Sequence, residues 1–137
     1  MVHVRELESH LRAIRTNSMS AIDEETGKVD QHTIDEQAQA LKRWIADLET
    51  AYVEEAKRKP VDSNKIGAEG RKLVEEAWFA YEIMLEVEQR SGEPPRPAEY
   101  EQLPSGIVTG EARVAMLSAL RDLTNHFAEF RRNVLKG

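Results

Sequence analysis

The residues of this sequence that could carry out chemistry are few, and the common catalytic patterns are missing. The chain contains no cysteine, which excludes disulfides, thiolate zinc sites and a cysteine nucleophile. Neither a glycine-rich phosphate-binding loop nor a G-x-S-x-G nucleophile motif occurs. Four histidines remain. The carboxylates and arginines around them decide whether any of them belongs to a site.

The spacing of histidine and glutamate does not favour a metal centre. Metal sites inside helical bundles use Glu-x-x-His motifs that point inward. Here His126 precedes Glu129, which is the reverse order, and Glu6 precedes His10 by four residues. The apolar rows that we expect in the core contain no carboxylate. We therefore expect neither a metal nor a cofactor.

One arginine and one histidine match a nucleolytic motif. The segment Arg121-Asp122-Leu123-Thr124-Asn125-His126 fits R-[N/D/H]-x3-H and so resembles the HEPN ribonucleases, which are all-α and often dimeric. The resemblance, which covers only these residues, implies that Arg121 and His126 act together on RNA at a dimer interface. On one continuous helix this spacing separates the two residues by about 140°. The alternative is that His126 borders the core and is held by Asp122, one turn earlier.

The stretch 73–87 has more apolar surface than one helix of a small bundle needs. Eleven of its fifteen residues are apolar and the other four are Glu. On a helical wheel the apolar arc covers roughly 220°, about twice the ~100° stripe of an ordinary surface helix. Aromatic residues are enriched at the centres of interfaces. We therefore predict that this helix contacts a second copy or another protein through Trp78, Phe79, Tyr81 and Ile83.

A competing explanation for the wide arc is internal. The segment 92–109 contains a Pro-rich stretch and shows no strong periodicity, which predicts a long loop. Such a loop could fold back over the arc and cover it with Tyr100, Leu103 and Ile107. The sequence leaves the two explanations open.

Basic residues cluster in two segments. Residues 57–72 contain six basic and two acidic residues, and residues 112–137 contain five basic and two acidic residues. In an up-down bundle these two segments lie at the same end, so we expect a basic pole there. Its residues are Lys57, Arg58, Lys59, Lys65, Arg71, Lys72, Arg131, Arg132 and Lys136. The simpler interpretation is that these cations lie at helix C-termini because the helix dipole favours positive charge there.

Apolar periodicity predicts the elements that carry these residues. Residues recurring at spacings of three and four indicate helices over about 3–25, 33–58, 63–91 and 110–135, with no strand pattern. We predict one all-α domain spanning 1–137, folded as a four-helix bundle of up-down-up-down topology. The weak segment around Asn17 leaves open whether the first helix stops near Arg15 or continues to residue 25.

Local signals refine the helices. Thr33 and Glu36 have the spacing of a capping box, which would start the second helix. Its core row is Ile34, Ala38, Leu41, Ile45, Leu48 and Tyr52. In the third helix, small residues at 70, 77 and 80 predict that a neighbouring helix approaches closely.

Composition limits the classes of function. Apolar residues make up 40% and charged residues 32% of the chain, which suits amphipathic helices. The net charge of −6 disfavours general nucleic-acid binding. No apolar run reaches the length of a membrane span, and the N-terminus lacks a signal-peptide core. We expect an acidic, cytoplasmic protein that does not bind membranes.

The function that the sequence favours is association rather than catalysis. We expect a non-enzymatic helical bundle that works as a homodimer or as a small subunit of a larger assembly. One alternative is a HEPN-like ribonuclease or toxin that uses Arg121 and His126. A second is a nucleic-acid accessory protein that uses the basic pole.

Overall fold

The computed structural model describes residues 4–23, 28–92 and 110–135, and the side chains of 6–23, 28–85 and 114–135. The chain forms four helices, α1 (Val4–Ser20), α2 (Gln31–Arg58), α3 (Ser63–Gly92) and α4 (Gly110–Phe130). A short 3-10 turn, η1 (Pro60–Asp62), joins α2 to α3, and a π-helical turn, η2 (Arg131–Leu135), continues α4. The predicted long loop was 92–109; Gly92 belongs to α3, and residues 93–109 lie outside the described residues. None of the described helices is long and apolar enough to cross a membrane.

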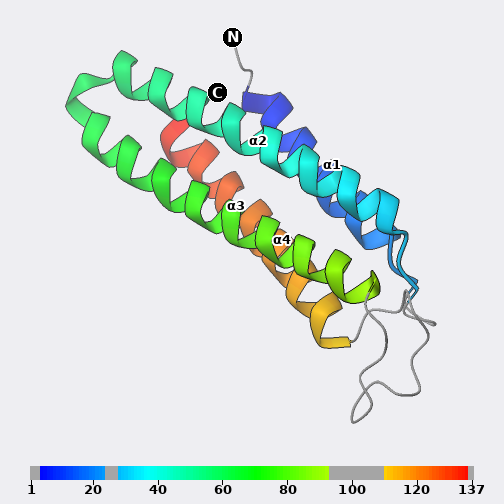
Figure 1. Cartoon of the computed structure of the whole chain (residues 1–137). Coiled ribbons are helices and arrows are strands. Elements are labelled where there is room, and N and C mark those ends of the chain that lie inside the picture. Colours follow the sequence, from blue (N-terminus) through cyan, green and yellow to red (C-terminus); the bar gives the residue numbers. More distant parts are fainter. Residues whose placement is uncertain (1–3, 24–27, 93–109, 136–137) are drawn as a thin grey trace.

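The helices form the predicted four-helix bundle of up-down-up-down topology. Successive helices run in opposite directions (Figure 1). Each helix packs against the next in the chain, and α1 also packs against α4, which closes the ring. Because direction alternates, the α2–α3 turn lies at the same end of the bundle as η2 (Figure 1).

The core is one continuous apolar cluster to which every helix contributes residues from one of its faces. The α2 row is fully buried from Ile34 to Leu48, and Tyr52 at its end is half-buried. In α4 the buried row is Met116, Leu120, Leu123, Phe127 and Phe130, and Val134 extends it into η2. Burial of this kind contributes roughly 1.5–3 kcal/mol per large apolar side chain.

Trp44 is a central core residue that lies outside the core row predicted for α2. Its side chain is buried, and its Nε1 donates a hydrogen bond to the Leu7 carbonyl oxygen at 2.8 Å. Its ring meets Phe127 edge to face, with centroids 5.3 Å apart. Trp44 therefore connects α2 to α1 through a polar contact and to α4 through an aromatic one.

The close approach predicted at Gly70 is present between α2 and α3. A Cβ atom added at Gly70 would lie 2.5 Å from the ring of Tyr52, whereas one added at Gly67 would have no atom within 4 Å. Two helices can pack this closely only where one of them lacks a side chain.

The N-terminus of α2 corrects the predicted capping box. The cap is Asp30, whose carboxylate accepts from the backbone N of Thr33 at 3.2 Å and from its Oγ1 at 2.8 Å. These two hydrogen bonds lower the pKa of Asp30. Glu36 does not complete a box with Thr33, because its side chain pairs with His32 at 2.6 Å. The helix consequently begins at Gln31, before the predicted position 33.

The first helix ends at Ser20, earlier than the predicted residue 25. Beyond it, Ile22 and Val29 form an isolated antiparallel bridge. The Asp23 amide donates to the Lys28 carbonyl at 2.9 Å, and the Asp30 amide donates to the Ala21 carbonyl at 2.8 Å. The backbone groups of this connection thus bond across the turn, so α1 does not continue.

Candidate functional site

The outward face of α3 carries two of the four predicted interface residues. Phe79 is 60% exposed and Trp78 is 36% exposed. Tyr81 and Ile83 are half-buried and pack against the core, one on each side of the buried row. The wide apolar arc of the sequence is therefore only partly covered by α2 and α4, and its surplus lies on Trp78 and Phe79.

Trp78 is supported from within its own helix. Its ring meets that of Tyr81 edge to face, with centroids 5.4 Å apart and an interplanar angle of 85°. Such pairs contribute about 0.5–1.5 kcal/mol beyond simple burial. Because Tyr81 itself packs against the core, it anchors the indole at the surface of the bundle.

Phe79 lies among charged residues. Glu75 and Glu82 are exposed one turn before and one turn after it, and Lys72 is exposed two turns before it. An apolar residue at this position is therefore surrounded by charged residues, as in protein interfaces with an apolar core and a polar rim. We define the α3 face as Arg71, Lys72, Glu75, Trp78, Phe79 and Glu82.

The basic pole is partly neutralised within the chain. Arg58 and Lys59 pair with the buried carboxylate of Glu55, and the Lys59 contact measures 2.8 Å. Burial raises the pKa of Glu55, but hydrogen bonds from Lys59 and Arg58 outweigh it and lower the pKa overall. Arg131 contacts Glu8 of α1 at 2.9 Å. The predicted core row of the second helix stopped at Tyr52 and missed Glu55, although Glu55 lies three residues further on and continues the same spacing.

The other described cations of the basic pole lie either near helix ends or on the α3 face. Lys57 lies in the last turn of α2, Lys65 lies in the first turn of α3, and Arg132 lies in η2; all three are exposed. Arg71 and Lys72 belong to the α3 face. Lys136 lies outside the described residues. Three of the predicted nine cations thus serve the fold through Glu55 and Glu8, and the pole carries less available charge than the sequence predicts.

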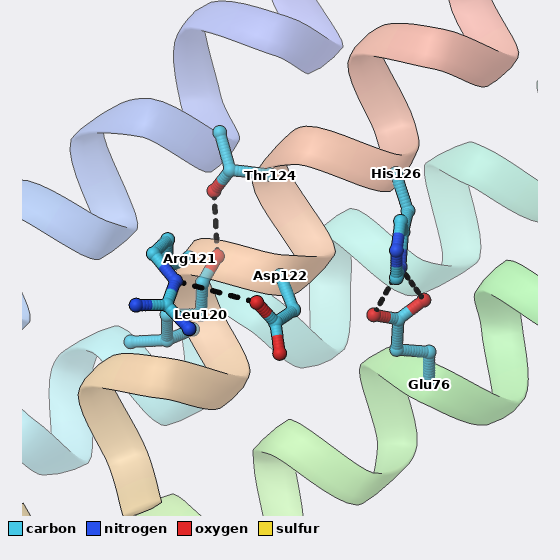
Figure 2. Close-up of polar contacts among 6 residues, drawn as sticks. All are labelled: Glu76, Leu120, Arg121, Asp122, Thr124 and His126. Atoms are coloured by element: carbon cyan, nitrogen blue, oxygen red, sulfur yellow. Dashed lines mark hydrogen bonds and ion pairs between the residues drawn. The ribbon is translucent and has the colours of Figure 1, made fainter. Parts of the chain in front are cut away.

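Arg121 and His126, the predicted nucleolytic pair, engage different carboxylates (Figure 2). The Arg121 Nε lies 3.3 Å from Asp122 Oδ1. The His126 Nδ1 lies 2.7 Å and 2.9 Å from the two carboxylate oxygens of Glu76 on α3. The two side chains point to different sides of α4 (Figure 2), as their spacing on one helix predicts.

The partner of His126 corrects the sequence interpretation. We expected Asp122 to hold it, but the contact is with Glu76, fifty residues away in the chain. Glu76 raises the pKa of His126 through this hydrogen bond and its charge, against a smaller opposing effect of burial. On a helical wheel, Glu76 lies apart from the other three glutamates of the stretch 73–87. This separate position was the only sign in the sequence that Glu76 has a different environment, and in the structure its side of the helix faces α4.

Neither the geometry nor known proteins assign a reaction. Among the described residues no group of three or more His, Asp or Glu side chains could hold a metal ion. Comparison of the chain with known protein families, with curated proteins and with solved structures finds no match. A functional inference must therefore come from the surface of this bundle.

Proposed function

We propose that this protein acts without catalysis, as a helical bundle that associates with another protein chain through the α3 face. The observation that carries the proposal is the exposure of Phe79, at 60%, in the middle of the longest helix. A bundle gains nothing by holding a phenylalanine in water at a position where charged residues surround it. Burying it against a partner contributes roughly 1.5–3 kcal/mol.

Trp78 supports the same surface. Large aromatic residues are over-represented among the few positions that carry most of the free energy of binding. Trp78 is already oriented by Tyr81, so less side-chain freedom is lost when a partner covers it. The partner is either a second copy, which makes a homodimer, or another protein in a larger assembly.

Light scattering on a sizing column tests the surface. Trp78→Glu and Phe79→Glu should each release the chain from its oligomer or its partner, while circular dichroism stays that of the wild type. Val114→Glu is the matched control, because Val114 is 56% exposed and lies on α4, outside the set of residues that defines the α3 face. If Val114→Glu disrupts association as strongly as Phe79→Glu does, the assignment to the α3 face is wrong.

The nucleolytic alternative has its own test. Arg121 and His126 each hold a carboxylate partner, and this supports a structural role for both over an action on RNA. Labelled RNA incubated with the wild type and with His126→Ala separates the two roles. Cleavage that disappears in His126→Ala would establish the ribonuclease and overturn the proposal of a non-catalytic protein.

A further inference from the structure

The charges on the α3 face are segregated along the helix. Arg71 and Lys72 precede its aromatic centre, and Glu75 and Glu82 flank Phe79. All four are exposed, and none of them takes part in an ion pair within the described part of the chain. Each end of this face therefore offers charge that a partner of opposite sign would complement.

A helix with cations at one end and carboxylates at the other complements itself when two copies pack in opposite directions. A two-fold axis that passes between the two α3 helices at the level of residue 77 places Lys72 opposite Glu82 of the partner subunit, since each lies five residues from that level. At 1.5 Å per residue, each Lys72–Glu82 pair lies about 7.5 Å along the helix from the level of the axis. At that distance the two packed helices are still close enough for these side chains to meet. The same axis sets Phe79 opposite Glu75 of the partner subunit, where it can pack on the aliphatic part of that side chain.

Two other arrangements of two copies place like charges together. Parallel packing in register brings Lys72 against Lys72 of the partner subunit and Glu82 against Glu82 of the partner subunit. Antiparallel packing centred between Trp78 and Phe79 brings Glu75 against Glu82 of the partner subunit. Like charges across an interface are strongly unfavourable, so charge disfavours both of these arrangements relative to the register centred at position 77.

We propose that the occupant of the α3 face is a second copy of this chain, packed with its α3 antiparallel and with two symmetric Lys72–Glu82 pairs across the interface. The inference rests on the proposed function and makes it more specific, because it names the partner and the register. A two-fold interface uses the same patch on both subunits, and self-complementarity is what such a patch requires.

Charge reversal with mixing tests the register. Lys72→Glu places glutamates against glutamates, and Glu82→Lys places lysines against lysines, so each variant alone should dimerise at least about tenfold more weakly. An equimolar mixture of the two restores both pairs and should yield a heterodimer of near wild-type affinity. Native mass spectrometry, with one chain isotope-labelled, distinguishes this heterodimer from homodimers.

Two further variants complete the design. The double variant Lys72→Glu/Glu82→Lys should dimerise by itself, because it exchanges the two charges. Arg43→Glu, at an exposed position of α2 outside the α3 face, should leave dimerisation unchanged. All substituted positions are exposed, and a chain that had lost its fold would not be rescued by mixing.

The outcomes separate the register from the surface. A wild-type dimer that Phe79→Glu dissociates, but that mixing of the two charge variants does not restore, overturns the antiparallel register and leaves the proposed surface intact. A dimer that Phe79→Glu does not affect overturns the proposed surface itself. A wild-type chain that stays monomeric at all concentrations overturns the second copy as occupant.

Discussion

The carboxylate of Glu76 on α3 holds the Nδ1 of His126 on α4 at 2.7 Å and 2.9 Å. The pair joins two consecutive helices of the bundle, and it is a partly exposed contact with 55% of the His126 side chain in solvent. It gives the bundle a dependence on pH near neutrality, because histidine is the side chain that titrates there.

Stability should fall as pH rises through the pKa of His126 in the folded chain. Glu76 raises that pKa above its ordinary value of 6.5, so the contribution is complete below about pH 6.5 and is lost above the folded pKa. For so exposed a pair we expect roughly 0.2–1 kcal/mol. Urea unfolding at about pH 6 and pH 8.5 measures the difference. Glu76→Gln should remove the difference and lower the pKa of His126 in an NMR titration; an unchanged pKa would contradict the assignment.

Replacing two glycines of α3 by alanine should change the free energy of unfolding in opposite directions. Gly67→Ala meets no atom within 4 Å, so only helix propensity changes and the free energy of unfolding should rise by up to about 1 kcal/mol. Gly70→Ala places a methyl group 2.5 Å from the Tyr52 ring, and overpacking of this kind costs about 1–3 kcal/mol. Thermal unfolding of the two variants gives the comparison. Equal shifts would mean that α2 and α3 do not approach closely at Tyr52.

The two tryptophans should differ in what they contribute to stability. Trp44→Phe removes the hydrogen bond to Leu7 and part of the contact with Phe127, and we expect a loss of about 1–3 kcal/mol. Trp78→Phe alters a surface residue and should change stability by less than about 0.5 kcal/mol. Denaturant titration followed by circular dichroism measures both. A Trp44→Phe chain as stable as the wild type would show that the buried indole does not tie α2 to α1.

The sequence predicts the bundle and its core rows because both depend on spacing alone. Ile34 to Leu48 and Met116 to Phe130 recur at intervals of three and four, and a helix places such residues on one face whatever its neighbours are. Trp44 was not included in the predicted core row of α2, because its burial depends on where α1 and α4 lie. The cap of α2 was missed because Asp30 and Thr33 are both suitable cap residues, and only the local backbone decides between them.

Contacts between segments far apart in the chain could not be predicted from the sequence for a similar reason. Periodicity fixes the face on which Glu76 lies but not the helix that faces it, so its partner His126 follows only from the way α3 and α4 pack together. The wide arc of α3 indicated surplus apolar surface, but the division between covered residues (Tyr81, Ile83) and exposed ones (Trp78, Phe79) depends on the exact positions of α2 and α4.

Sedimentation of the wild type and of Phe79→Glu, compared over a range from about 1 µM to about 100 µM, tests the central claim most directly. Association of two copies through the α3 face predicts that the wild type shifts from monomer to dimer across this range. The same account predicts that Phe79→Glu remains a folded monomer throughout. A wild-type dimer whose dissociation constant is the same in Phe79→Glu would contradict the account.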